Sequence, residues 1–438
     1  MSKVPPPKGT RDFYPEEMAI HNWICDRWKA ISQRNGFVEY DGPIFEYLQL
    51  YTQKSGDEIA SQLFSLTDRG GRELAIRPEM TPTLARMVNQ KINALPKPIK
   101  WFSTPRLCRA ERPQKGRLRE FYQWNIDIIG SDHLLADAES IFTAVDYLRS
   151  VGLLSSDIEV KLSSRSMIAA VLIDIGFDAN NLDPVYVLLD KRAKVSIDAF
   201  TEMVAEVVTD KALAEKLMQL QGVTTLDEVA QMATSEDAKN AITALRQLFN
   251  YLTEMGIGDY VVFDIKIVRG LDYYTGPVFE IFDKKTPLRA LCGGGRYDDL
   301  LAGLGGQSVP ATGFGMGDVV LEILLQERGL LNSNKSTLDT YIFSMDASLT
   351  NKSLQIVSHL RNAGWHTTLS YKQAAIGKQF KQATNLGAAC CIILGKETIT
   401  DNKITIKHLA SGQQKTITLP TLTNECPDKA NTPFFECI

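Results

Sequence analysis

The sequence predicts an α+β fold with two parts: a large first part built on strand hairpins with an inserted helical segment, and a small C-terminal α/β domain. Three observations support this prediction. Residues 119–128 alternate between polar and apolar side chains, as one arm of a half-buried hairpin does. Residues near 165–255 are rich in Ala and Leu and have a helical pattern. After residue 338, short strand-like and helix-like runs alternate, which is typical of a parallel sheet.

These patterns also predict domain limits. We expect a first domain at residues 1–330, in which about 165–255 form the helical insertion. The polar run "LLNSNKSTLD" then predicts a linker at 331–338. A second domain is expected at 339–425, followed by a tail at 426–438.

The composition is that of an ordinary globular protein of 438 residues, with 44% hydrophobic residues and a net charge of −4. No apolar run approaches the roughly 18–20 residues that a membrane span needs, and the N-terminus lacks a signal-peptide pattern. Seven cysteines without framework spacing indicate reduced thiols in a cytoplasmic protein. The five histidines have no metal-ligand spacing, so we expect no metal site on the chain.

The first elements follow from periodicity. Apolar residues at helical spacing predict a helix over 16–35, and Gly36 ends it. An extended segment follows, with Gly42-Pro43 as punctuation. Two strands around a turn at 69–71 then lead to a helix that begins near Thr81, and we expect Thr81 to cap that helix.

One short stretch concentrates positive charge on a chain that is otherwise slightly acidic. "CRAERPQKGRLREFYQWNID" runs from Cys108 to Asp127 around a "PQKG" turn. Local cation density determines phosphate binding, because each contacted phosphate releases counterions. The stretch therefore predicts localised binding of a polyanion. Its cations are Arg109, Arg112, Lys115, Arg117 and Arg119.

The second arm of this hairpin has two unlike faces. One face carries Tyr122, Trp124, Ile126 and Ile128, which indicates a core face. The other face carries Arg119, Phe121, Gln123, Asn125 and Asp127. A polar face of this composition indicates the lining of a site, although a solvated outer face has the same pattern.

Three further motifs carry polar or glycine residues that suit a ligand. The run Gly293–Gly295 in "CGGGRYDD" indicates close approach of a ligand or tight strand packing. "VRGLDYYTG" places Tyr273 and Tyr274 near Arg269, either as hydrogen-bond donors to a small polar ring or as a core edge. "RPEMTPT" offers Glu79 and Thr81 as acceptors for an ammonium group, or as the first turn of a helix.

Taken together, these motifs indicate ATP-dependent activation of a small amino acid. Arg109, Arg269 and Arg296 come from separate segments and would stabilise triphosphate charge. The acceptor pair and the polar strand face would hold the amino acid.

Several long motifs resemble one known family. "RAERPQKGRLREFYQWNID", "VRGLDYYTG" and "GGGRYDDLL", in this order, look like motifs of histidyl-tRNA synthetase, a class II aminoacyl-tRNA synthetase, in its bacterial type. "PPPKGTRDFYP" and "GKQFKQATNLGAACCIILG" are also similar to that family, so the resemblance covers nearly the whole chain. It implies an antiparallel-sheet catalytic domain with a helical insertion, a C-terminal α/β anticodon-binding domain, and a cytoplasmic homodimer formed through the motif that contains Pro43.

The resemblance implies ligation of L-histidine to tRNA-His through a histidyl-adenylate, with ATP and Mg²⁺. Arg109 and Arg269 would be the catalytic residues at the α-phosphate, and Glu111 would bind ATP together with Arg109. Arg112 and Gln114 would contact the acceptor end of the tRNA, including its extra 5′ guanosine. The histidine-binding set would be Glu79, Thr81, Gln123, Asp127, Arg269, Tyr273, Tyr274 and Tyr297. Asp127 stands where many relatives carry Glu.

The chain departs from the family in the third class motif. That motif normally carries an arginine stacked on adenine, three positions after its last glycine, but "GMGDVVLEIL" has Val320 there. This departure leaves three alternatives: another cation covers the adenine, ATP binds without a stacked cation, or the protein does not activate ATP. One cation–π contact contributes roughly 0.5–2 kcal/mol.

Two other functions are compatible with part of these motifs. One is a non-catalytic histidine sensor that resembles the regulatory subunit of ATP phosphoribosyltransferase, which lacks the anticodon domain. The other is a synthetase-like RNA sensor without activation chemistry. The C-terminal domain and the "RPQKGR" turn favour the enzyme.

Overall fold

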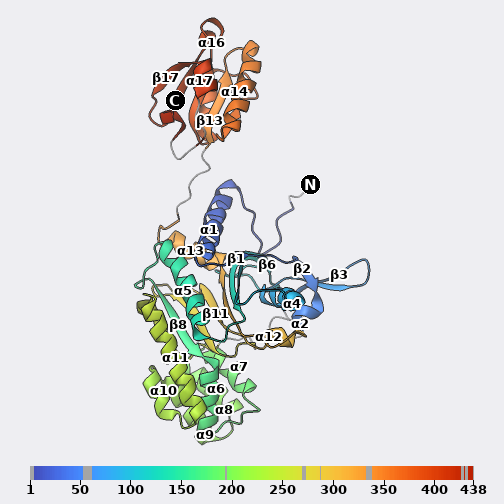
Figure 1. The fold of residues 1–438 in the computed structure, drawn as a ribbon, viewed down its shortest axis with the longest axis vertical. Coiled ribbons are helices and arrows are strands. Elements are labelled where there is room, and N and C mark those ends of the chain that lie inside the picture. The colour runs from blue at the N-terminus through green and yellow to red at the C-terminus, as the bar shows by residue number, and fades with distance from the viewer. Residues whose placement is uncertain are drawn as a thin grey trace. The chain divides into compact units, whose positions relative to one another are not determined.

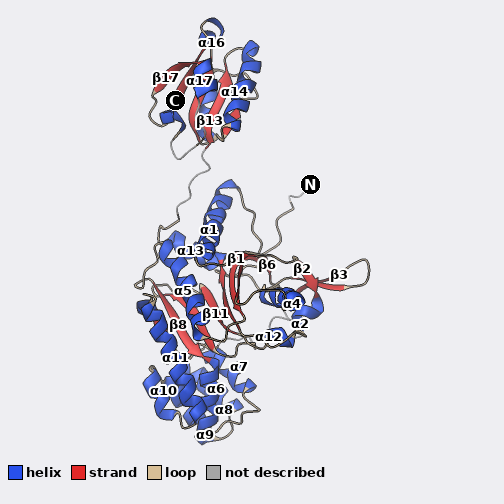
Figure 2. Cartoon of the chain, in the orientation of Figure 1, coloured by secondary structure: helices blue, strands red, loops and turns tan. Residues whose placement is uncertain are grey.

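The computed structural model describes residues 4–52, 62–192, 195–268, 273–286, 288–331, 338–425, 429 and 433–437. The chain divides into two compact units, Met1–Asn332 and Ser333–Ile438 (Figure 1). Each unit combines helices with its own sheets (Figure 2), which confirms the predicted α+β class.

The central sheet of the first unit is mostly antiparallel. Its strands run in the order β1-β5-β7-β12-β11-β10-β8-β9, and β6 pairs with β7 beside this path. The pairs β1–β5 and β8–β9 are parallel. The strands are Val38–Glu39 (β1), Ile99–Ser103 (β5), Arg106–Cys108 (β6), Glu120–Ile129 (β7), Ile158–Ser164 (β8), Val261–Phe263 (β9), Pro277–Asp283 (β10), Cys292–Arg296 (β11) and Ala311–Gly317 (β12).

Aromatic side chains join the N-terminal helix α1 (Pro15–Arg34) to the apolar face of β7. The Trp28 and Trp124 rings stack with centroids 6.1 Å apart, and Tyr147 of α5 (Leu134–Ser150) meets Trp124 edge-on at 5.4 Å. Trp124 Nε1 donates a hydrogen bond to Ser32 Oγ at 2.8 Å. Because all four residues are buried, this junction fixes which face of β7 turns away from the core.

A smaller sheet with the order β2-β4-β3 lies in the same unit. Its elements are β2 (Phe45–Tyr47), α2 (Leu48–Thr52), β3 (Phe64–Thr67), β4 (Glu73–Ile76) and the following helix α4 (Thr81–Lys91). The N-cap of α4 is Met80, and no side chain caps it. The expectation that Thr81 caps this helix is therefore wrong. Thr81 is the first helical residue, and Pro82 follows it in the first turn, where the missing N–H needs no partner.

The inserted segment is helical, and side-chain caps begin most of its helices. Ser164, Ser196, Asp210, Thr225 and Ser235 each accept a hydrogen bond from a first-turn N–H. Its apolar residues belong to the same buried cluster as those under the central sheet, so the insertion is packed against it. The helices are α6 (Arg165–Ile175), α7 (Asp183–Lys191), α8 (Ile197–Val207), α9 (Lys211–Gly222), α10 (Leu226–Met232) and α11 (Glu236–Glu254).

Two of the three consecutive glycines in β11 allow close strand packing. A Cβ on Gly294 would lie 2.2 Å from the Gly313 carbonyl oxygen, and one on Gly295 would lie 2.6 Å from the Pro277 carbonyl oxygen. No side chain fits at such distances, which explains the run at these two positions.

Arg296, at the end of β11, is a structural residue. Its guanidinium pairs with Asp137 of α5 at 2.6 Å and also donates to the Ser131 carbonyl oxygen at 3.0 Å. Both side chains of the pair are buried. The expectation that Arg296 stabilises triphosphate charge is therefore wrong, because its donors already have partners inside the fold.

The remaining elements of this unit are η2 (Gly258–Tyr260), α12 (Leu300–Gly303) and α13 (Asp318–Glu327).

The second unit has a sheet in the order β14-β13-β15-β16-β17. The first three strands are parallel, as predicted, but β16 and β17 add an antiparallel hairpin because they follow one another through a short turn. Phe434 packs edge-on against Trp365 at 4.9 Å. Its elements are β13 (Leu338–Ser344), η3 (Ala347–Leu349), α14 (Thr350–Asn362), β14 (Thr367–Leu369), α15 (Ile376–Asn385), β15 (Ala388–Leu394), α16 (Lys396–Thr400), β16 (Lys403–His408), β17 (Gln414–Thr418), α17 (Leu419–Glu425) and α18 (Phe434–Cys437). Among the helices described in either unit, none is long and apolar enough to span a membrane.

Arg296→Met should strongly destabilise the first unit. The substitution leaves the buried Asp137 carboxylate unpaired, and losing one partner of a buried ion pair costs about 3–5 kcal/mol. Urea unfolding followed by tryptophan fluorescence measures the loss. Lys239→Met is the control, because it removes an exposed pair with Glu236 and should cost under about 1 kcal/mol. Equal losses in the two variants would contradict the structural role of Arg296.

Candidate active site

A cavity opens over the centre of the main sheet, where β7, β12, β11 and β10 lie side by side. It has a volume of about 470 Å³ and continues into a second hollow of about 770 Å³. The two share their central lining, so they form one continuous site. The shared residues are Arg109, Glu111, Arg117, Gln123, Glu280, Phe282, Arg289, Gly293 and Gly315.

The polar face of β7 forms the floor of the cavity, as its alternation predicts. Gln123, Asn125 and Asp127 all line it, and the last two are buried. The neighbouring strand β12 leaves room for them. A Cβ on Gly315 would lie 2.3 Å from Gln123 Nε2, and one on Gly313 would lie 2.6 Å from Asp127 Oδ1. At Gly313 the backbone carbonyl oxygen of Ile126 is nearer still, at 2.2 Å, so close packing of the two strands also requires glycine there.

Asp127 is the most deeply placed acid of the site. The Tyr297 hydroxyl donates a hydrogen bond to its Oδ1 atom. Burial raises the pKa of Asp127 to about 7, although this hydrogen bond opposes the rise. Burial also raises the pKa of Tyr297 well above its usual value, so the phenol keeps its proton. The pair offers a carboxyl acceptor that changes charge near neutral pH.

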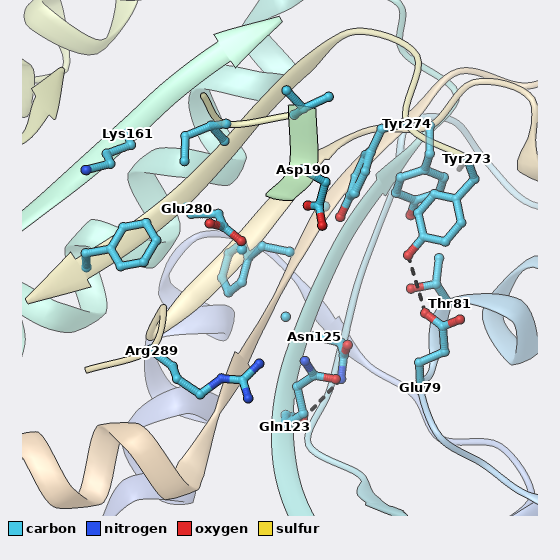
Figure 3. Close-up of a pocket in the computed structure, with 18 of the residues that line it drawn as sticks. Glu79, Thr81, Gln123, Asn125, Lys161, Asp190, Tyr273, Tyr274, Glu280 and Arg289 are labelled. Carbon is cyan, nitrogen blue, oxygen red and sulfur yellow. Dashed lines mark hydrogen bonds between the residues drawn. The ribbon is translucent and has the colours of Figure 1, made fainter. Parts of the chain in front are cut away.

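Tyr273, Tyr274 and a second acid, Glu79, form one wall of the cavity (Figure 3). The Tyr273 ring lies 5.0 Å from the Tyr274 ring and 5.8 Å from the Tyr297 ring, as centroid distances. The Tyr273 hydroxyl donates to Glu79 Oε2 at 3.3 Å, and Thr81 lies next to this contact. This end of the cavity is therefore rich in acceptors and aromatic faces.

The other end of the cavity is cationic. Arg109, just after β6, donates from Nε to the Pro78 carbonyl oxygen at 3.0 Å. Arg117 Nε pairs with Glu111 Oε2 at 2.6 Å. Glu111 Oε1 is buried and has no hydrogen-bond partner among the described residues, so it is available as an acceptor for a ligand.

The turn between β6 and β7 stands at the edge of the cavity. Gln114 pairs with Arg117 across the turn, and Gly116 has a φ of +77°, which the tight turn requires. Arg112 and Gln114 are exposed. Arg119 differs from the other cations of this stretch, because its Nε donates to the Glu111 carbonyl oxygen at 3.0 Å and so supports the turn.

The structure brings together most of the residues that the sequence selected. Arg269 lies outside the described residues, although Val268 and Tyr273 on either side of the gap line the cavity. Arg112 is absent from the described lining of both hollows, and Gln114 lines the larger one. The predicted residues that line the smaller hollow are Glu79, Thr81, Arg109, Glu111, Gln123, Asp127, Tyr273, Tyr274 and Tyr297.

Sequence reasoning missed several lining residues. Glu280 lies on β10, Arg289 lies in the connection between β10 and β11, and Lys161 comes from β8 (Figure 3). Asp190 of α7 brings the helical insertion to the cavity. The signal for Arg289 was present in "RALCGGGRYDD", where a cation precedes the glycine strand.

The residues of the cavity fit a metal ion that enters bound to a nucleotide better than a metal ion held by protein side chains alone. Within the described ranges, no group of three or more His, Cys, Asp or Glu side chains is arranged to hold a metal ion. Mg²⁺ usually binds through one or two carboxylates plus substrate phosphates. Glu280, which lines both hollows, is a carboxylate of the type that such an Mg²⁺–nucleotide complex uses.

Asp127→Asn should change how stability depends on pH. A carboxyl whose pKa is raised by folding stabilises the fold at low pH, and this contribution is lost as pH rises through the folded value of about 7. Asn keeps the acceptor for Tyr297 but does not titrate. The melting temperature of the variant relative to the parent should therefore rise between about pH 4 and 7 and then level off. A difference that is constant with pH would contradict the raised pKa.

Comparisons with known proteins identify the family. A family model described as Histidyl-tRNA synthetase matches residues 9–318, and one described as Anticodon binding domain matches residues 338–429. A chloroplastic/mitochondrial histidine–tRNA ligase of Arabidopsis thaliana is 38% identical over 419 residues, which cover 96% of this chain and 86% of that protein. A histidine–tRNA ligase of Opitutus terrae is 40% identical over 407 residues, which cover 92% and 93%.

The fold has the same relatives. The crystal structure of histidyl-tRNA synthetase from Nostoc sp. PCC 7120 matches with a TM-score of 0.80 at 21% identity, over 96% of this chain and 98% of that chain. The match confirms the predicted class II architecture of the fold. Both family models and the near full-length relatives agree, and the chain belongs to the histidyl-tRNA synthetase family.

Proposed function

We propose that this protein ligates L-histidine to tRNA-His through a histidyl-adenylate, with release of pyrophosphate and AMP. The observation that best supports this proposal is the difference in charge between the two ends of one continuous cavity. Its inner end has acceptors and tyrosines around Asp127, and its outer end has guanidinium groups at Arg109 and Arg117. Such a cavity suits a small cationic or polar amino acid at one end and a triphosphate at the other.

The inner end would select histidine. The Asp127 carboxyl and Gln123 would hydrogen-bond the imidazole, and Tyr297 fixes the carboxyl that does so. Glu79 and Thr81 would accept from the ammonium group, while Tyr273 and Tyr274 form the wall. A site built to hydrogen-bond a polar ring rejects amino acids without one, because its buried acceptors would be left unpaired.

The outer end would carry out activation. A carboxylate oxygen of histidine attacks the α-phosphorus of ATP, the bond from that phosphorus to the bridging oxygen breaks, and pyrophosphate leaves. Arg109 and Arg269 would stabilise the charge that develops on the α-phosphate oxygens. Glu111 would accept from the adenine. Mg²⁺ bound to ATP would shield the β- and γ-phosphates.

The exposed turn would receive the tRNA end. Arg112 and Gln114 stand beside the cavity on a short turn, which suits contact with the acceptor end while ATP occupies the outer hollow. The terminal hydroxyl of the tRNA then attacks the carbonyl carbon of the adenylate, and AMP leaves. We assign anticodon binding to residues 339–425, and treat 165–255 as the inserted domain, 331–338 as the linker and 426–438 as the tail.

A cytoplasmic homodimer completes the proposal. Apolar side chains beside Pro43 and along β2 and β3 are exposed in the single chain, and a partner subunit would cover them. The exposed residues are Ile44, Phe45, Tyr47 and Leu66. Cys25, Cys108, Cys390 and Cys391 form no disulfide in the described structure, which suits a reducing compartment.

The non-catalytic histidine sensor is not favoured. The matched anticodon-binding region has no use in a protein that only senses histidine. Both near full-length relatives carry the name histidine–tRNA ligase.

Histidine-dependent ATP–pyrophosphate exchange tests the proposed activity. The parent protein should exchange with histidine and with no other amino acid. Arg109→Ala should lower the exchange rate by about 10²–10³, because one preorganised donor to developing charge is lost. Arg246→Ala is the control, since it removes only a surface pair with Asp227 in the insertion. A parent protein that binds histidine without exchange would refute the activity.

Gln114→Ala separates the tRNA step from activation. We expect slower transfer of histidine to tRNA-His with an unchanged exchange rate, because the side chain is exposed on the turn at the edge of the larger hollow. Single-turnover transfer from preformed adenylate measures the first quantity, and pyrophosphate exchange measures the second. Equal losses in both would place Gln114 in the ATP site instead.

A further inference from the structure

The larger hollow contains a slot that suits a flat ring. Phe121 on β7 and the segment that precedes β11 both line it, and β12 lies between them in the sheet. Two strand spacings separate these walls, which is roughly 9–10 Å. Gly293, Gly315 and Gly317 line the slot in between, so no side chain divides it.

Arg289 stands in that segment as a cation without a partner. Its guanidinium lines both hollows and makes no hydrogen bond or ion pair with any described residue (Figure 3). The other cations of the slot are engaged. Arg109 donates to the Pro78 carbonyl oxygen, and Arg117 pairs with Glu111.

Cations at the two ends of α13 are engaged as well. Arg11 pairs with Asp318 at 2.5 Å and with Glu322 at 3.3 Å. Arg328 pairs with Asp283 at 2.7 Å. Among the cations that line the larger hollow, Arg289 is therefore the one whose guanidinium makes neither a hydrogen bond nor an ion pair with a described residue.

The surroundings of Arg289 favour an electron-rich ligand. Burial, followed by the nearby charges of Arg117 and Arg109, lowers the pKa of Arg289, while the charges of Glu111 and Glu280 oppose this. Arginine stays charged in proteins, so the lowered pKa reports unfavourable surroundings for its charge. An aromatic ring over the guanidinium plane, or an anion beside it, relieves that cost.

Other features of the slot favour an aromatic ring over an anion as its ligand. Phe121, Leu288 and Val320 give it apolar walls, and Glu111 Oε1 is a buried acceptor without a partner in the described structure. A buried carboxylate oxygen repels phosphate but accepts from an exocyclic amino group. These features fit a purine that carries an amino group.

We propose that Arg289 is the cation that packs on the adenine ring of ATP, with Glu111 accepting from the base. The assignment rests on the proposed function for the identity of the nucleotide. It places the cation in the segment before β11, whereas the family resemblance expects it at the position of Val320 on α13. Val320 contributes an apolar wall beside Gly116 instead, with 3.3 Å between its Cγ2 and a Cβ built on Gly116.

Nucleotide binding by the full-length protein tests the proposal without turnover. Calorimetry with ATP and with tripolyphosphate compares binding with and without the base. Arg289→Ala should weaken ATP about 2- to 30-fold, the range of a cation–π contact, and leave tripolyphosphate unchanged. Arg289→Lys should recover little of the loss, because a hydrated ammonium replaces a flat guanidinium.

Matched variants exclude a general loss of charge or fold. Lys285→Ala changes an exposed cation of the same connection, paired with Asp157 at 2.5 Å, and should leave ATP affinity unchanged. Equal loss of ATP and tripolyphosphate, full recovery with Arg289→Lys, or no effect of Arg289→Ala would each overturn the assignment. A parent protein that binds ATP without pyrophosphate exchange would defeat only the proposed function.

Discussion

The site depends on the glycines of β12, which allow β7 to carry a row of polar side chains inside the fold. Gly313 and Gly315 pair with Asp127 and Asn125 in the ladder, and their missing side chains create the space that the polar groups occupy. A side chain at position 313 would collide with Asp127 and with the Ile126 carbonyl oxygen, and one at position 315 would displace Gln123. The opposite face of β7 is fixed by the Trp124 junction, so the strand cannot shift register without burying its polar face in the core.

Because β7 carries this polar face, the cavity has an acidic end and a cationic end. Asp127 sits at the bottom, where burial holds its pKa near 7 and Tyr297 orients it. The cations stand toward the β6–β7 turn, where Arg117 is anchored by Glu111 and Arg109 by a backbone carbonyl. Histidine and ATP would then meet between the two ends, with the reacting carboxylate and α-phosphate adjacent. Proximity of this kind replaces a collision in solution by a reaction within one complex.

The sequence predicted the fold class and the polar face of β7, because alternation and helical spacing are local signals. Long-range packing decided the rest. The motif around Arg296 resembles that of a ligand-binding arginine. Its partner Asp137 lies on α5, far away in the sequence, and this buried ion pair gives Arg296 a structural role. The sequence favours Thr81 as the N-cap of α4, but Met80 is the N-cap and Thr81 is the first helical residue. Arg289 was missed because its place before the glycine strand does not show that strand order brings this segment over the same cavity as β7. The role of Arg269 stays a prediction from resemblance.

A crystal structure with a non-hydrolysable histidyl-adenylate analogue, such as a histidyl-sulfamoyl adenosine, tests the central claim most directly. The account predicts the imidazole within hydrogen-bond distance of the Asp127 carboxyl, the sulfamoyl group near Arg109, and the adenine between Phe121 and Arg289 with its amino group at Glu111. An analogue bound with its base at Asp127, or with its adenine away from Arg289 and Glu111, would contradict it.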